Sequence, residues 1–162
     1  MNNEIFFPEN EFIISKTDAK GKITYCNELF INVSGYDTKE LIEKPHSILR
    51  HQDMPKVIFK KLWDDLQKGH EVFAYVKNKT KHGDYYWVLA FVTPSHGANK
   101  QFAEYFSVRR APNKDTVRNF IEPLYRDLLQ QERTGGISAS ARYLEDLLKQ
   151  KGLTYEQFIF SF

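Results

Sequence analysis

The stretch EVFAYVKNKTKHGDYYWVLAFVTP, residues 71–94, decides the fold class. In its first part Val72, Ala74 and Val76 alternate with other side chains, which is the period of a β-strand. The KHGD segment at 81–84 predicts a turn, and the nearly continuous apolar run at 84–94 is typical of a central strand. Residues 101–110 alternate again, so we expect three consecutive antiparallel strands here.

Upstream, residues 12–17 and 22–27 read as a second hairpin, joined by a turn that ends in Gly21. Four short helical segments follow before residue 71: residues 28–34 ended by Gly35, residues 38–43, residues 45–51, and a clear helix from about 57 ended by Gly69. Asp37 and Glu40 form a capping-box pattern at the start of the second segment. The prediction is an α+β fold: a five-stranded antiparallel sheet with short helices on one face and a hollow between the layers.

The last 50 residues have a helical pattern. We expect helices at 116–132 and 139–151, separated by Thr134-Gly135-Gly136, and an apolar segment at 154–162 that opens with a Thr154–Gln157 capping box. The organisation is therefore a sheet domain at 1–112 and a helical extension at 113–162. The extension either packs back on the sheet or serves as a docking or dimerisation element, and the sequence favours neither.

Composition excludes several classes of protein. The 23 Lys and Arg residues nearly balance the 21 Asp and Glu residues, which speaks against nucleic acid as a partner. No apolar run is long enough to span a membrane, no secretion signal is evident, and the single cysteine, Cys26, suggests a reducing, cytoplasmic location. No catalytic or metal-binding motif is evident, so we expect neither an enzyme nor a metal site. Aromatic residues make up 15% of the chain, which fits either a large core or an aromatic-lined ligand cavity.

Three blocks carry a family resemblance: ITYCNELFINVSGY at 23–36, PHSILRHQDMP at 45–55 and VKNKTKHGDYYWVLAFVTP at 76–94. Together they closely resemble the PAS domain of bacterial aerotaxis and energy-taxis receptors, and the resemblance covers about residues 10 to 127. It implies a PAS fold that binds FAD non-covalently and senses redox state.

The resemblance also implies cofactor-binding residues, namely Asn27 and the block Arg50, His51 and Asp53. The chemistry agrees, because a guanidinium can hold a pyrophosphate bidentately and an amide can meet the edge of the isoalloxazine ring. We also expect cofactor contacts from Trp63, Asn78 and Trp87. Tyr85 and Phe91 could line the slot with Trp87, and strand alternation decides which of them face inward, which the sequence leaves open by one register step. Relatives that bind flavin usually carry a Trp where this chain has Val72, and this departure predicts a weaker or reshaped ring-binding wall.

Two other readings stay open. A heme-binding PAS gas sensor would use His46 or His51 as the axial ligand. A cofactor-free PAS interaction module would contain only a collapsed cavity. The light-sensing LOV branch, which forms a flavin–thiol adduct, is excluded because residues 48–52 contain no cysteine and Cys26 falls on a strand.

For a partner, the chain resembles a stand-alone PAS subunit of a two-protein energy-taxis system. This implies a signal-transduction role in which a membrane-bound methyl-accepting chemotaxis transducer receives the signal. The protein would then be cytoplasmic, held near the inner membrane through its partner without inserting into it, and a homodimer stays open.

Overall fold

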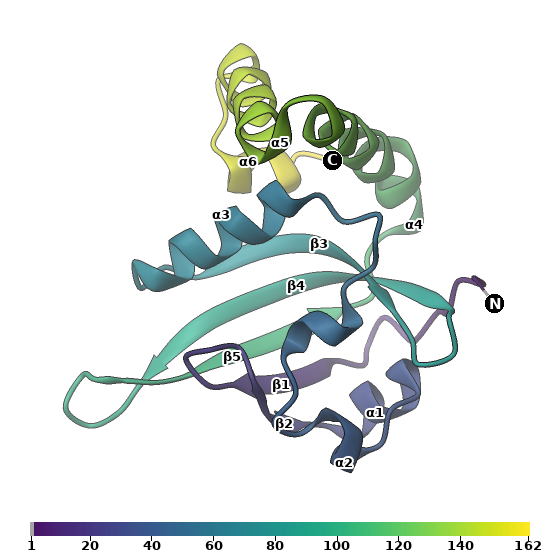
Figure 1. Ribbon diagram of the computed structural model, residues 1–162, viewed down its shortest axis with the longest axis vertical. Helices are drawn as coiled ribbons and strands as arrows, with labels where there is room; N and C mark the ends of the chain where they lie inside the picture. Colours follow the sequence, from purple (N-terminus) through teal and green to yellow (C-terminus); the bar gives the residue numbers. More distant parts are fainter. Residues whose placement is uncertain (1) are drawn as a thin grey trace.

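The computed structural model describes residues 2–162 and contains one five-stranded sheet (Figure 1). The strands are β1 (Ile13–Thr17), β2 (Ile23–Cys26), β3 (Val72–Lys79), β4 (Tyr85–His96) and β5 (Phe102–Arg110). Their spatial order is β2-β1-β5-β4-β3, and every neighbouring pair is antiparallel. The α+β architecture with a five-stranded antiparallel sheet is confirmed.

Four short helices connect β2 to β3: α1 (Glu28–Ser34), α2 (Thr38–Leu41), the 3-10 helix η1 (His46–Leu49) and α3 (Lys56–Gln67). Gly35 ends α1 in the left-handed conformation, with a φ of 78° that favours glycine. Asp37 and Glu40 form the expected capping box at the start of α2. In Figure 1 these helices run from the β2 edge of the sheet to the β3 edge.

Strand alternation gives the sheet two differently used faces. Side chains such as Val76, Asn78 and Arg109 face the short helices and line a cavity. Side chains of the alternate set, including Tyr75 of β3 and Trp87 of β4, contact the C-terminal helix α5 from the other face. The hydrophobic core therefore extends to both sides of the sheet, and both faces of β3 and β4 are largely buried.

The C-terminal extension consists of α4 (Lys114–Thr116), a π-helical turn η2 (Val117–Ile121), α5 (Glu122–Lys151) and α6 (Tyr155–Ile159). The expected break is present as a kink, because Gly136 has non-helical angles (φ 72°, ψ −168°) within α5. The Thr154–Gln157 capping box is also present. The sequence pattern missed the π-helical turn, which has the same apolar spacing as the start of an α-helix.

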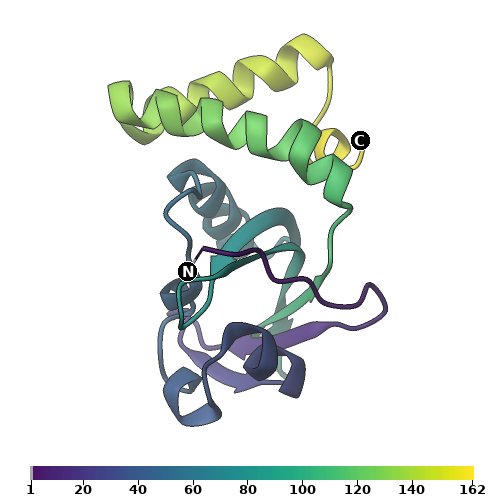
Figure 2. The same cartoon turned by 90° about the vertical axis from the view of Figure 1, so that its right-hand side faces the viewer.

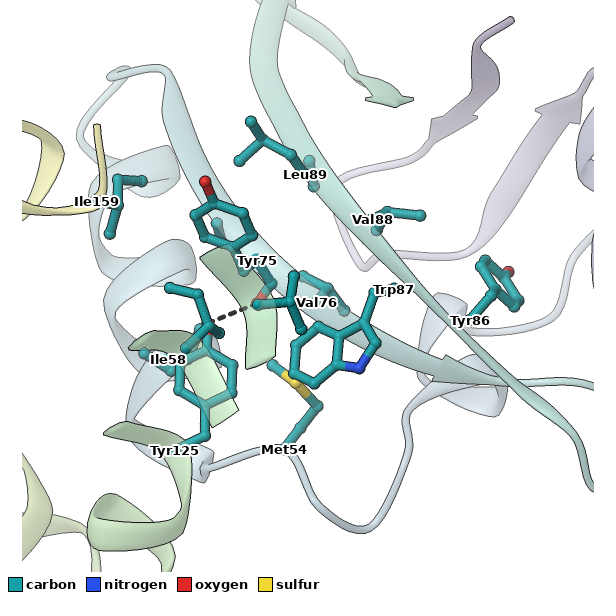
Figure 3. Close-up of a cluster of buried hydrophobic side chains, with 14 of the residues drawn as sticks. Met54, Ile58, Tyr75, Val76, Tyr86, Trp87, Val88, Leu89, Tyr125 and Ile159 are labelled. Carbon is teal, nitrogen blue, oxygen red and sulfur yellow. Dashed lines mark hydrogen bonds between the residues drawn. The ribbon is translucent and has the colours of Figure 1, made fainter. Parts of the chain in front are cut away.

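The extension packs back on the sheet domain (Figure 2). The Tyr125 hydroxyl donates a hydrogen bond to the backbone carbonyl of Tyr75, and the rings of Tyr125 and Trp87 lie 6.0 Å apart between centroids (Figure 3). Phe73 of β3 contacts Phe160 edge to face at 4.9 Å. Among residues 2–162, no helix is both long and apolar enough to span a membrane.

Candidate functional site

A cavity of about 330 Å³ lies between the sheet and the short helices. Its residues come from β1, η1, α3 and the three strands β3, β4 and β5, so it occupies the hollow that the sequence pattern predicts. The volume is within the range of ligand-binding pockets in proteins. The collapsed cavity expected of a cofactor-free module is not what the structure contains.

One wall of the cavity is a stripe of apolar side chains on α3. Phe59, Leu62, Trp63 and Leu66 recur at three- and four-residue intervals, which places them on one face of the helix. Small apolar residues of the sheet, Val76, Ala90 and Val92, face them across the cavity. The two walls together form a slot suited to a flat aromatic group.

The Trp63 ring is fixed by two neighbours at one end of the slot. It contacts Tyr105 of β5 edge to face, with the ring centroids 5.4 Å apart. It also lies over Gly21 so closely that a Cβ built there would be 3.2 Å from a ring carbon. Val72, where the family resemblance leads us to expect a Trp, is buried in a small cluster with Leu66 and Tyr105 that Trp63 packs against. Trp63 thus supplies an aromatic surface at this end of the cavity.

A buried polar cluster lies in the strand wall around Arg109 of β5. The guanidinium is 3% exposed and donates hydrogen bonds to Nε2 of His46 at 2.6 Å and to the Ser15 hydroxyl at 2.7 Å. Its Nε atom has no hydrogen-bond partner among residues 2–162. The guanidinium carbon also lies 4.8 Å from the centre of the Phe30 ring.

His46 is electrically neutral in this setting. Burial and the neighbouring charge of Arg109 lower the pKa of its imidazole from 6.5 to about 3. Its Nε2 atom therefore accepts the Arg109 hydrogen bond at neutral pH. An axial heme ligand would need this nitrogen for the iron, so the Arg109 contact disfavours the heme reading for His46.

The remaining cations of the cavity lie where it opens to solvent. Arg50 and Lys20 line the cavity and are both exposed. The Arg50 guanidinium carbon is 3.8 Å from the centre of the Phe59 ring, a cation–π contact that orients it, and the partial desolvation of this exposed side chain lowers its pKa. No Asp or Glu is among the described residues that line the cavity. The cavity is therefore cationic.

Asn78 of β3 lies within the cavity wall and is 4% exposed. Its register partner on β4 is Tyr86, whose pKa burial raises to about 12. Its amide offers both a donor and an acceptor, and this is the chemistry needed to meet the edge of a heterocycle.

The sequence-predicted residues divide into two groups. Arg50, Trp63 and Asn78 line the cavity, and so does His46. The other four predicted residues do not line it, namely Asn27, His51, Asp53 and Trp87. Asn27 is the N-cap of α1: its oxygen accepts hydrogen bonds from the backbone N–H groups of Ile14 and Phe30, and its amide donates to the Phe12 carbonyl. These three bonds hold β1 to α1.

His51 and Asp53 face away from the cavity, toward Lys77. The Asp53 carboxylate is 2.8 Å from the Lys77 ammonium, and the ring of His51 accepts a hydrogen bond from the Asp53 backbone at 3.0 Å. Burial raises the pKa of Asp53, but the hydrogen bond and charge of Lys77 bring its net pKa below the usual value. Burial and the Lys77 charge lower the pKa of His51. Of the block Arg50, His51 and Asp53, only Arg50 therefore lines the cavity.

Trp87 lies on the opposite face of the sheet. It lines a second hollow of about 250 Å³ with residues of the N-terminal segment and η2, and its indole nitrogen has no hydrogen-bond partner among residues 2–162. Tyr85 and Phe91 share its face by strand alternation. Cys26, the single cysteine, does not line the main cavity. No cluster of potential metal ligands occurs in the described part of the chain.

Sequence reasoning missed Arg109, Ser15, Phe59 and Tyr105. Arg109 and Arg110 are adjacent in the sequence, and strand alternation requires one of them to point inward. Phe59 belongs to the same helical stripe as Trp63, so the period of α3 would have found it once Trp63 was chosen.

Comparisons with known proteins identify the family and the fold. The family model for the PAS fold matches residues 23–109. The chain belongs to the PAS family. It is 40% identical over 116 residues to the aerotaxis receptor of Escherichia coli (strain K12), covering 72% of this chain and 22% of the receptor. It is 27% identical over 97 residues to the nitrogen fixation regulatory protein of Klebsiella pneumoniae, covering 60% of this chain and 20% of that protein.

Solved structures show the same fold at low sequence identity. The light-state LOV domain of the blue-light photoreceptor Aureochrome1 superimposes with a TM-score of 0.62 at 18% identity, covering 68% of this PAS chain and 89% of the LOV chain. The PAS domain of the fruit-fly ELK potassium channel gives a TM-score of 0.56 at 17% identity, with 61% and 85% covered. This PAS chain spans about a fifth of the length of the curated relatives that it matches.

Proposed function

We propose that this PAS protein is a redox sensor for energy taxis that holds FAD non-covalently in the main cavity. The observation that carries the proposal is the cavity's composition: apolar and aromatic walls, with Lys20, Arg50 and Arg109 and no acidic residue among the described lining residues. FAD combines a flat aromatic ring system with an anionic pyrophosphate, and a cationic slot of this kind complements both parts.

The buried residues of the cavity fit the ring system of FAD, and the exposed residues at its mouth fit the phosphates. The buried slot between α3 and the sheet suits the ring system, with the Asn78 amide available to its polar edge. Exposed Arg50 and Lys20 suit the phosphates at the mouth of the cavity. When bound, FAD would supply reversible electron transfer, while the chain's residues bind it, orient it and exclude water.

The signal would leave the cavity through α3. This helix carries the apolar wall of the slot and also contacts α5 of the C-terminal extension, where Glu132 accepts hydrogen bonds from the first turn of α3. A change of charge in the ring would alter its contacts with the cavity wall and so favour one packing of these helices over another. Such a role is one of sensing, with no catalytic step of its own.

A separate membrane-bound chemotaxis transducer is the partner that we propose, with the PAS protein cytoplasmic and near the membrane through that partner. Similarity to the aerotaxis receptor over 116 residues supports the taxis role from which this partner follows. Self-association would be an alternative use of the surfaces outside the cavity.

The test is a titration of flavin-free protein with FAD, FMN and riboflavin, followed by flavin fluorescence. We expect FAD to bind more tightly than riboflavin, because only the phosphorylated ligands reach Arg50 and Lys20. Arg50→Ala should weaken FAD binding by about tenfold to a hundredfold, as the loss of charge-assisted hydrogen bonds implies, and leave riboflavin binding nearly unchanged. Arg126→Ala, an exposed arginine on α5, is the matched control. Failure to bind any flavin would contradict the proposal.

A further inference from the structure

The buried guanidinium of Arg109 is the least satisfied charged group that faces the cavity. Two of its nitrogens donate to neutral acceptors, His46 and Ser15, and its Nε–H has no partner among residues 2–162. Unlike Arg50, which is exposed and lies against Phe59, Arg109 is 3% exposed. Bulk solvent therefore screens its charge only weakly.

No counter-ion compensates this charge either. No described residue that lines the cavity is acidic, and the ionisable groups that face Arg109 are His46 of η1, Tyr86 of β4 and Cys26 of β2. Burial raises the pKa of Tyr86 and of Cys26 and lowers that of His46, so all three are uncharged at neutral pH. Burial also lowers the pKa of Arg109 to about 10, which leaves it cationic. An isolated buried charge is costly, and a ligand that brings negative charge would compensate it.

The neighbouring groups hold the guanidinium in place for such a ligand. His46 accepts at 2.6 Å and Ser15 at 2.7 Å, which fixes two of the three nitrogens, and the Phe30 ring lies 4.8 Å from the guanidinium carbon. A donor fixed in advance loses little freedom when it meets an acceptor, so its interaction with a developing charge is strong. The other two cations, Arg50 and Lys20, lie at the exposed mouth, where water screens them.

We propose that Arg109 is the residue that receives the negative charge that develops on the bound flavin ring on reduction, and that it thereby raises the ring's reduction potential. This inference rests on the proposed function. The oxidised ring is neutral, and the addition of two electrons from a reductant and one proton from solvent leaves it with a single negative charge. Arg109 stabilises that form, while Arg50 binds the phosphates, whose charge does not change on reduction.

The test compares reduction potentials of FAD-loaded protein during titration with dithionite, followed by absorbance. Arg109→Gln should lower the two-electron midpoint potential by about 30 mV or more, equivalent to at least a tenfold loss of preference for the reduced form. Arg109→Lys, which keeps the charge, should recover part of that shift. The matched control is Arg50→Gln, which should weaken FAD binding and leave the potential of the bound fraction unchanged.

A measurement on the unaltered protein covers the case in which Arg109→Gln does not fold or does not retain FAD. Between pH 5 and 6, uptake of one proton with two electrons gives a midpoint potential that changes by about 30 mV per pH unit, and uptake of two protons gives about twice that. We expect the smaller slope, because Arg109 keeps the reduced ring anionic. The larger slope, or a potential unaffected by Arg109→Gln, would overturn the inference alone. Failure of the unaltered protein to take up FAD would overturn the proposed function and this inference together.

Discussion

The carboxylate of Glu132 on α5 accepts a hydrogen bond from the backbone N–H of Val57, in the first turn of α3, at 3.1 Å. Its second oxygen accepts from the preceding N–H group at 2.9 Å. The N-cap residue of α3 is Pro55, whose side chain has no hydrogen-bond acceptor. Glu132, which lies 75 positions after Val57 in the sequence, therefore caps the helix. The capping carboxylate also complements the positive end of the helix dipole. The helix that walls the cavity and the C-terminal extension are thus directly joined.

Removing this cap should destabilise the protein. Glu132→Ala leaves two N–H groups of α3 without their partner, and we expect the free energy of unfolding to fall by about 1 to 2 kcal/mol, the usual cost of losing a helix cap. Glu145→Ala, an exposed glutamate on the same helix, is the control and should change stability by less than about 0.5 kcal/mol. Urea denaturation measures both. Equal effects of the two changes would show that the cap contributes nothing specific.

The second attachment of the extension is the hydrogen bond from Tyr125 to the Tyr75 carbonyl. Both residues are buried, so Tyr125→Phe leaves the carbonyl without a partner and should cost about 1 to 3 kcal/mol. The control is Tyr143→Phe on the same helix, whose hydroxyl bonds the exposed Asp127 carboxylate at 3.1 Å and can be replaced by water. Thermal unfolding of both variants measures the difference. If Tyr125→Phe were as stable as the unaltered protein, the hydrogen bond from Tyr125 to Tyr75 would not help to attach the extension to the sheet.

Gly21 controls the position of Trp63. Its φ of +82° favours glycine, and an added Cβ would come within 3.2 Å of the Trp63 ring. Gly69 has a nearly equal φ of +84° but open space around it, so Gly69→Ala isolates the backbone strain. We expect Gly21→Ala to be the more destabilising change and, unlike Gly69→Ala, to shift the tryptophan fluorescence. Identical fluorescence in the two variants would show that Trp63 does not lie on the turn.

Stability should depend on pH through His46. Its pKa is about 3 in the folded protein and near 6.5 in the unfolded chain. Between these values the unfolded chain binds more protons, so the free energy of unfolding falls as the pH is lowered, by at most about 1.4 kcal/mol per pH unit for one such group. Above pH 7 this contribution is constant. His51, whose pKa is also lowered, adds to the same trend.

Denaturation curves between pH 4 and pH 8 test this dependence. His46→Gln should flatten the loss of stability below pH 6.5, whereas His70→Gln, which removes an exposed histidine, controls for the change of residue type. A curve for His46→Gln as steep as that of the unaltered protein would contradict the assignment of a neutral, desolvated imidazole.

Local signals predicted much of the fold. The capping boxes at Asp37 and Thr154, the left-handed glycine Gly35 and the kink at Gly136 depend on neighbouring residues and are all present. The alternation of apolar residues predicted the strands but not which alternate set faces the helices, because a shift of one residue exchanges the faces. For this reason the sequence names Trp87 as a cavity residue without fixing its face, and the structure places it on the opposite face of the sheet.

The polar residues of the cavity could not be predicted from the sequence, because their positions depend on long-range contacts. Arg109 meets Ser15 across 94 residues and His46 across 63, and no local pattern indicates either contact. Asn27 has the short amide side chain that suits both a cofactor and a helix cap, and only its three hydrogen bonds identify the cap. The apolar residues of the extension would suit a partner surface or this sheet equally. The packing of the extension on the sheet could therefore not be predicted from the sequence.

The central claim is that the cavity of this PAS protein holds FAD, and the most direct test is the absorption spectrum of the freshly purified protein with identification of the extracted chromophore. We predict the two-banded spectrum of an oxidised flavin that bleaches with dithionite, and extraction of one FAD per chain. A Soret band, or a colourless protein that takes up no FAD when the cofactor is added, would contradict the account.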